Sequence, residues 1–111
     1  MDWIEVYRSK VKELLNKYSQ YKPSYGEVER AQIFDTERDR YQLLTIGWNE
    51  QKRVYGTMMH LDIKNGKIWI QENTTEFDLA NELVEMGVLK QDIVIGFNTP
   101  KMRELTDFAI G

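Results

Sequence analysis

The chain has 111 residues, 41% of them hydrophobic and 30% charged, which is the composition of one globular domain that buries a core without cross-links. With no cysteine, it has no disulfide, thiolate metal site or cysteine nucleophile, so a disulfide-built secreted domain is excluded. A formal net charge of −3 gives no general attraction to phosphates. No secretory leader or membrane-length apolar run is present, so we expect a cytoplasmic protein without membrane contact and one domain over residues 1–111.

The first predicted element is an amphipathic helix from Asp2 to about Tyr21. Its apolar side chains recur at helical spacing, and the charged side chains fall elsewhere on the helical wheel. Asp2 is placed to cap the first free amides, and Lys22-Pro23 predicts the end of the helix because a residue before proline disfavours helical backbone. The predicted buried stripe consists of Ile4, Tyr7, Val11, Leu14, Leu15 and Tyr18.

Between residues 27 and 73 the hydrophobic period changes to two, and β-branched and aromatic residues dominate, which predicts strands. Asn65-Gly66 is the strongest hairpin signal, because both residues accept the positive φ angles of a type I′ turn. The connections are short and polar and leave no room for parallel crossovers, so we expect an antiparallel meander. The predicted strands are Glu27–Asp35, Arg40–Trp48, Arg53–Lys64 and Lys67–Asn73.

The Asn65-Gly66 turn also predicts the register of the last hairpin and hence its two faces. One face is apolar and is expected to carry the helices. The other is polar with a tryptophan at its centre, which is either an interface anchor or covered by the C-terminal tail. The expected pairs are Ile63 with Ile68, Asp62 with Trp69, Leu61 with Ile70 and His60 with Gln71.

Beyond the strands, Thr75 is expected to cap a helix over Glu76–Met86, with Gly87 as its left-handed stop. Residues 93–97 are too few for periodicity to separate a strand from a buried helical turn, and Thr99-Pro100 predicts a short final helix. The predicted fold is therefore α+β. It is a four-stranded antiparallel meander packed on one face with the long N-terminal helix and the second helix, followed by a short C-terminal element.

The sequence contains no recognisable catalytic constellation. His60 is the only histidine, and with Asp62 it supplies two ligands where a zinc site usually needs four. No glycine-flanked serine marks a nucleophile, and the acidic turn at residues 35–39 is not followed by the glycine and glutamate of a calcium loop. We therefore expect no catalytic residue, no metal and no cofactor, and a structural or interfacial role for His60.

Acidic residues are concentrated near the C-terminal end. Residues 68–111 contain 3 basic and 8 acidic groups, whereas residues 1–67 contain 12 basic and 10 acidic groups. This surplus around the second predicted helix is either a solubilising face or a docking surface for a basic partner such as a DNA-handling protein. The candidate partner-binding residues are Glu82 and Glu85 on that helix and His60, Asp62, Trp69 and Gln71 on the polar sheet face.

Several segments resemble the XisI family, which is described as the fdxN element excision controlling factor of cyanobacteria. The most specific are DTE-x-D-x-Y-Q-L-L at residues 35–44 and DIK-x-GKIWIQ at residues 62–71, with further similarity in ELVEMGV and DIVIGF at residues 82–88 and 92–97. The resemblance implies an accessory role in site-specific excision of a DNA element. A separate recombinase would exchange the strands, and an XisH-like protein would be the partner. The resemblance supplies no catalytic residue.

Three hypotheses about the function are compatible with the sequence. The first is a non-enzymatic controlling factor that acts through an XisH-like partner and only indirectly on the recombinase. The second is an excision cofactor that binds DNA directly, which requires a basic surface and predicts a steep salt dependence. The third is an inhibitory or antitoxin-like subunit that neutralises a nuclease-like partner through the acidic helix. A homo-oligomer is compatible with each of them.

Overall fold

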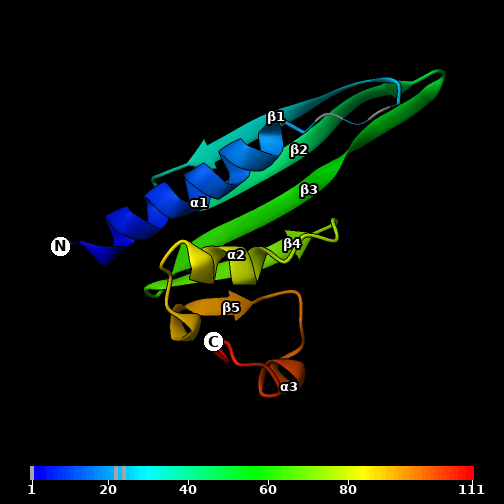
Figure 1. Cartoon of the computed structure of the whole chain (residues 1–111). Helices are drawn as coiled ribbons and strands as arrows, with labels where there is room; N and C mark the ends of the chain where they lie inside the picture. The colour runs from blue at the N-terminus through cyan, green and yellow to red at the C-terminus, as the bar shows by residue number, and fades with distance from the viewer. Residues whose placement is uncertain (1, 22, 24) are drawn as a thin grey trace.

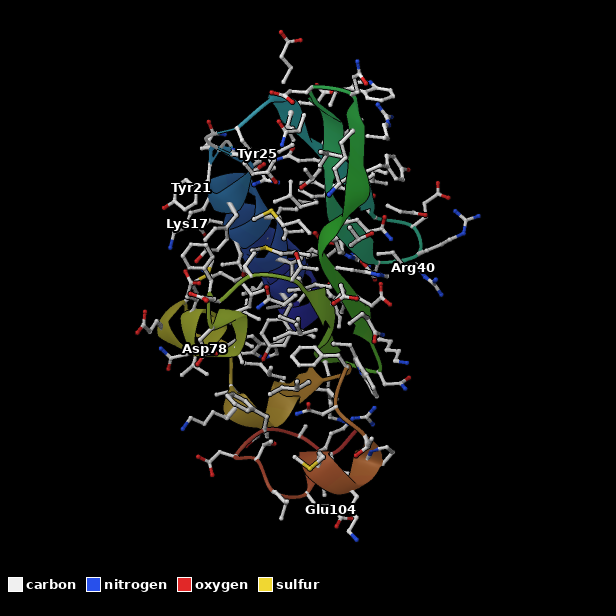
Figure 2. All side chains as sticks on the ribbon, turned by 90° about the vertical axis from the view of Figure 1, so that its right-hand side faces the viewer. Lys17, Tyr21, Tyr25, Arg40, Asp78 and Glu104 are labelled. Atoms are coloured by element: carbon white, nitrogen blue, oxygen red, sulfur yellow. The ribbon has the colours of Figure 1, made fainter. Side chains whose placement is uncertain are left out.

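A computed structural model describes residues 2–21, 23 and 25–111, and Figure 1 shows its course. Five strands form one sheet in the order β1-β2-β3-β4-β5, in which β1 to β4 are antiparallel neighbours and β5 is parallel to β4. The helices α1 and α2 lie on the same side of this sheet (Figures 1 and 2). The elements are α1 (Trp3–Ser19), β1 (Glu27–Asp35), β2 (Arg40–Asn49), β3 (Lys52–Lys64), β4 (Lys67–Asn73), α2 (Leu79–Glu85), the 3₁₀ turn η1 (Lys90–Asp92), β5 (Ile93–Ile95) and α3 (Pro100–Arg103).

The α+β class, the N-terminal helix and the meander of β1 to β4 are confirmed, but the predicted number of strands is wrong. The sheet has five strands and is mixed, because α2 and η1 form a crossover that returns β5 to the free edge of β4. Ile93 pairs with Ile68 and is completely buried. The C-terminal segment then adds a parallel bridge between Val94 and Ala109 beside β5.

The helix α1 begins as predicted and ends slightly earlier. The Asp2 carboxylate accepts a hydrogen bond from the Ile4 amide at 3.0 Å, which caps the first turn. The helix ends at Ser19 rather than near Tyr21, and Lys22, half of the predicted stop signal, lies outside the described residues. Among the helices that the structure describes, none is long and apolar enough to cross a membrane.

The β3–β4 hairpin follows the predicted register near its turn and departs from it further along. Asn65 and Gly66 have φ angles of 55° and 76°, as a type I′ turn requires. The expected pair of His60 with Gln71 is wrong, because the register shifts between His60 and Leu61 and His60 pairs with Glu72. Gln71 is thus the additional residue of a β-bulge, which lets its side chain reach Asp62.

The second helix is shorter than predicted, and its cap is Asp78 rather than Thr75. The Asp78 carboxylate accepts a hydrogen bond from the Asn81 amide at 3.1 Å. Thr75 instead donates its hydroxyl to the Asn73 side chain at 2.6 Å, and the same Asn73 oxygen accepts the Thr75 amide. The Asn73 side chain therefore holds the chain in a turn before helix formation starts. The C-terminal end agrees with the prediction, since Gly87 has a φ of 100°.

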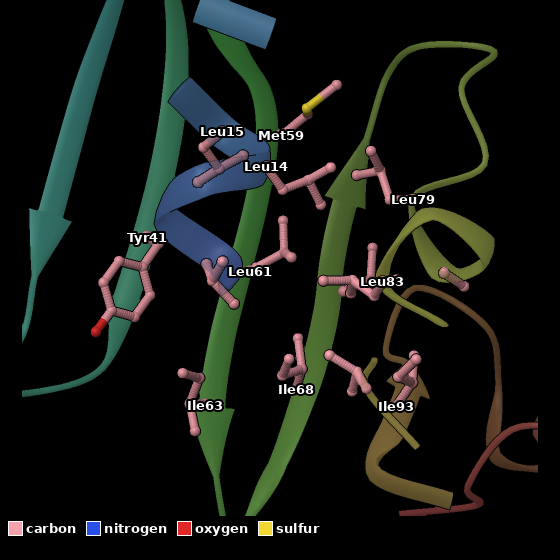
Figure 3. Close-up of a cluster of buried hydrophobic side chains, with 14 of the residues drawn as sticks. Leu14, Leu15, Tyr41, Met59, Leu61, Ile63, Ile68, Leu79, Leu83 and Ile93 are labelled. Atoms are coloured by element: carbon pink, nitrogen blue, oxygen red, sulfur yellow. The ribbon is translucent and has the colours of Figure 1, made fainter. Parts of the chain in front are cut away.

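One hydrophobic core lies between the sheet and the two helices (Figure 3). Leu14 and Leu15 of α1 meet Met59 and Leu61 of β3, and α2 closes the core from the side of β4 and β5. Burial of such side chains contributes roughly 1.5–3 kcal/mol each. The predicted stripe of α1 is buried as expected at Tyr7, Val11, Leu14, Leu15 and Tyr18.

Three core tyrosines each donate their hydroxyl to a carboxylate at the edge of the core. Tyr7 donates to Asp92 at 2.6 Å, Tyr41 to Asp39 at 2.9 Å, and Tyr18 to Glu82. Burial, reinforced by these carboxylates, raises the pKa of Tyr7 and of Tyr18 to about 12, so both are neutral donors at physiological pH. Tyr7 and Tyr18 thereby tie α1 to η1 and to α2.

Candidate protein-interaction surfaces

Three of the predicted site residues form one hydrogen-bonded cluster on the sheet face opposite α1. The ring nitrogen Nε2 of His60 lies 2.8 Å from Oδ1 of Asp62, and Gln71 donates its amide to Oδ2 of Asp62 at 3.2 Å. Asp62 is buried, and both of its carboxylate oxygens have a hydrogen-bond partner within the cluster, as a buried polar group requires. Over the residues that the structure describes, no group of three His, Asp or Glu side chains is arranged to hold a metal ion.

Trp69 lies beside this cluster, half-buried under the C-terminal segment. Its ring is flanked by the Lys64 ammonium at 4.0 Å and the Arg103 guanidinium at 5.1 Å from the ring centroid. Arg103 also donates to the carbonyls of Asn98 at 3.1 Å and Ile110 at 3.3 Å, which holds that segment in place. Of the two arrangements considered for Trp69, the structure therefore has the tail covering it.

The two predicted acids of α2 lie away from this cluster and differ from each other. Glu82 is bound to α1: Lys17 Nζ lies 2.6 Å from its Oε1, and the Tyr18 hydroxyl donates to its Oε2. Glu85 is exposed, and among the described residues only the Asn81 side-chain amide donates to it, at 3.2 Å. The six predicted residues thus do not form one surface, and Glu82 has a structural role that its place in the sequence did not reveal.

We expect Glu82→Lys to lower the free energy of unfolding by about 1.5–3 kcal/mol, because it leaves the hydroxyl of the buried Tyr18 without its charged acceptor. Glu85→Lys makes the same change of charge three residues away and should stay within about 0.5 kcal/mol of wild type. Urea denaturation of both variants measures the difference. Equal effects would show that the Tyr18–Glu82 contact contributes nothing to stability.

A hollow of about 130 Å³ lies between the start of α2 and the edge of β4 and β5. Phe77 and Phe97 are exposed at this hollow, although the sequence pattern did not single out either of them. Glu76 and Asp78 flank Phe77 in the chain and are exposed as well (Figure 2 labels Asp78). The lining residues, here called the α2 hollow, are Ile70, Asn73, Phe77, Asp78, Leu79, Ala80, Ile95 and Phe97.

The chemistry of the α2 hollow suits a protein partner. Exposed aromatic groups beside charged groups are typical of interaction surfaces, and a small apolar hollow can accept one side chain of a partner. Since the nearby charges are acidic, the matching side chains are apolar and basic. The sequence offers one indication of this surface, which is a phenylalanine between two acidic residues at the start of a helix. The same pattern is equally compatible with a buried phenylalanine.

Two comparisons with known proteins agree with each other on the family. The family model described as XisI protein matches residues 1–110. A crystal structure of a XisI-like protein from Anabaena variabilis ATCC 29413 is similar, with 42% identity, a TM-score of 0.91 and coverage of 97% of this chain and 99% of that one. The fdxN element excision controlling factor XisI from the same strain is 37% identical, with a TM-score of 0.85 and coverage of 99% and 100%. No curated protein sequence gives a significant match.

Proposed function

Since this chain belongs to the XisI family, we propose that it is a non-enzymatic accessory protein that controls site-specific excision of a DNA element through a protein partner. The partner is an XisH-like protein, and a separate recombinase performs strand exchange. The observation that carries the proposal is the similarity, over nearly the full length of both chains, to a protein described as an excision controlling factor.

The distribution of charge supports action through a protein rather than through direct binding to DNA. DNA binding depends on clustered Lys and Arg that displace counterions from phosphates. In residues 68–111 acids outnumber bases by 8 to 3, and Glu72, Glu76 and Glu85 are exposed. Such a surface repels a phosphate backbone and attracts a basic protein surface.

The α2 hollow is the surface that we assign to this partner. An apolar side chain of the XisH-like protein would enter between Phe77 and Phe97. Basic side chains of the same partner would face Glu76 beside the hollow and Glu85 at the far end of α2. Glu82 contributes little to this contact, because its carboxylate is already paired with Lys17 and Tyr18.

The test is a binding assay between the purified chain and a purified XisH-like protein. We expect the double substitution Glu76→Lys/Glu85→Lys to weaken the complex by about 10-fold or more, since both exposed acids would then repel a basic partner. Isothermal titration calorimetry at two salt concentrations measures the loss. A wild-type complex that is insensitive to salt would contradict an electrostatic contact.

The matched control is Glu37→Lys/Glu50→Lys, which changes the net charge equally at exposed turns on β1–β2 and β2–β3. This variant should bind the partner like wild type. An electrophoretic shift of element-end DNA by the chain alone at physiological salt would overturn the proposal in favour of direct DNA binding. Loss of nuclease activity of the partner upon binding would instead identify the chain as an inhibitory subunit.

A further inference from the structure

The sheet has a second face, opposite α1, that no described element covers along β1, β2 and the first half of β3 (Figure 2). The pairing brings side chains of three strands into rows across this face. Helix-side residues alternate with them, as the contact between Gln32 and Asn16 of α1 shows. The rows, here called the open face, are Glu27–Trp48–Arg53, Glu29–Ile46–Tyr55, Ala31–Leu44–Thr57 and Ile33–Gln42–His60.

The open face is apolar at its centre and exposes large side chains. Tyr55 is 66% exposed, Trp48 50% and Ile33 49%. The Arg53 guanidinium lies between two of these aromatics, 5.2 Å from the ring centroid of Trp48 and 5.8 Å from that of Tyr55. Aromatic and arginine side chains of this kind are enriched at the centre of protein interfaces.

The charges of the open face are segregated by strand. The acids Glu27 and Glu29 lie on β1, and Arg53 lies on β3 in the same row as Glu27, with Trp48 on β2 between them. A shallow depression of about 440 Å³ is lined by these three charged residues together with Ile46. An acidic strand on one side and a basic residue on the other do not form the continuous positive track that a nucleic acid needs. They do form a surface that is complementary to itself.

We propose that the open face binds a second copy of this chain about a two-fold axis that runs parallel to β2. This rotation keeps each residue at the same height along the strand direction. It places β2 of one copy over β2 of the other, and β1 of each copy over β3 of the other. Glu27 then meets Arg53 of the second copy twice, once on each side of the axis. Trp48 and Ile46 meet their own counterparts, and the Glu29 carboxylate meets the Tyr55 hydroxyl.

The dimensions of the open face are sufficient for this contact. Three neighbouring strands over four rows cover on the order of 14 × 25 Å, and two sheets that pack face to face lie about 10 Å apart, aligned within about 30°. The flat footprint is therefore about 350 Å², and the projecting Trp48, Tyr55 and Ile33 side chains add accessible area to it, which corresponds to an interface below the ~800 Å² per partner of the standard size and to weak association. The apolar rows lie at the middle of the patch and the charges toward its edge.

The first test is the mass of the protein in solution by sedimentation equilibrium. We expect twice the chain mass of 13.2 kDa for wild type at about 100 μM, where a dimer with a micromolar Kd is populated. Tyr55→Lys should raise the dimer Kd by more than about 30-fold, as loss of a central aromatic does. Leu105→Lys replaces another highly exposed apolar residue, outside the open face, and should leave the dimer intact.

Circular dichroism checks that Tyr55→Lys remains folded, and Ile33→Lys on β1, the other outer strand of the open face, provides an independent variant. A wild-type chain that remains a monomer at this concentration overturns the proposal. A dimer that neither Tyr55→Lys nor Ile33→Lys weakens also overturns it. The same holds for a monomer that uses Tyr55 to bind single-stranded nucleic acid or another protein.

A charge-swap experiment tests the orientation of the axis. Glu27→Arg alone and Arg53→Glu alone should each weaken the dimer about 3- to 10-fold, because each places like charges opposite one another. The double variant should associate more tightly than either single one, since the pair is restored with reversed sign. If the double variant is as weak as the sum of the two single changes, the proposed axis is wrong.

This inference is independent of the proposed function. The α2 hollow lies on another part of the surface, so the substitutions Glu76→Lys/Glu85→Lys should leave the dimer mass unchanged. Conversely, Tyr55→Lys should leave binding of the XisH-like protein by the α2 hollow unchanged. Failure of either assay therefore identifies which of the two surfaces has been misassigned.

Discussion

Replacing Gly47 by alanine is expected to lower the free energy of unfolding by about 3 kcal/mol or more. A Cβ atom at this position would lie 2.1 Å from the Glu27 carbonyl oxygen and 2.7 Å from the Val28 Cα atom. Both are backbone atoms of β1, so neither can rotate away. The strands β1 and β2 would have to separate at this end, and urea denaturation followed by circular dichroism measures the loss.

Gly56 provides the matched control for this substitution. It lies on β3, where it pairs with Thr45 of β2, and a Cβ atom there would have open space around it. Gly56→Ala should be neutral or stabilise the protein by up to about 1 kcal/mol, because alanine loses less backbone entropy on folding. If both variants are equally stable, the close approach of β1 to Gly47 does not exist in solution.

The example of Gly47 illustrates which features of the fold are predictable from sequence. Helical spacing placed α1, and alternation placed the meander, because both patterns depend on local periodicity. The Asn65-Gly66 turn was predictable because its backbone conformation is tied to residue type. The close approach at Gly47 and the bulge at Gln71 depend on how one strand lies against another, and no pattern within a single strand records that.

The same distinction applies to the fifth strand and to the sites. Ile93–Ile95 is too short for its period to be measured, and its strand conformation comes from pairing with β4. His60 and Asp62 were predictable neighbours because they are two residues apart on one strand. The pairing of Glu82 with Lys17 and Tyr18 is not predictable from a local pattern, because these partners lie 65 and 64 residues away in sequence. The open face is likewise not predictable from one strand, because its rows form only when three strands are in register.

The second large effect is expected at Asp39, where three side chains meet between α1 and the β1–β2 turn. Arg8 donates from Nε to Oδ1 at 2.7 Å and from Nη2 to Oδ2 at 3.0 Å, and the Tyr41 hydroxyl donates to Oδ1 at 2.9 Å. The Asp39 carbonyl also accepts the Ile63 amide at 2.9 Å. The φ of Asp39 is 54°, a conformation that aspartate and asparagine tolerate better than most residues.

Asp39→Asn preserves the backbone preference and the size of the side chain while removing its charge. We expect a loss of about 2 kcal/mol near neutral pH, because two charge-assisted hydrogen bonds are weakened and the buried Tyr41 hydroxyl loses an ionised acceptor. Asn rather than Ala is the appropriate substitution, since Ala would add the strain of a positive φ to the loss of the carboxylate.

The effect should depend on pH in a defined direction. The hydrogen bonds from Arg8, with that from Tyr41, hold the pKa of the Asp39 carboxyl below its usual range. A carboxylate whose pKa is lower in the folded state stabilises the fold fully above the unfolded-state pKa of about 3.9, and this contribution disappears as the pH falls through the folded-state value. The stability difference between wild type and Asp39→Asn should therefore be constant near neutral pH and shrink below about pH 4.

Asp35 provides the comparison, because its pKa is also lowered but it lies at an exposed turn. The main cause is the hydrogen bond from the Arg38 amide, followed by that from the Arg38 side chain. Asp35→Asn should change stability less than Asp39→Asn, since solvent screens its charge. Denaturation curves of both variants at several pH values separate the two carboxylates. A difference between wild type and Asp39→Asn that persists undiminished in acid would show that the side chain acts through packing rather than through its ion pair with Arg8.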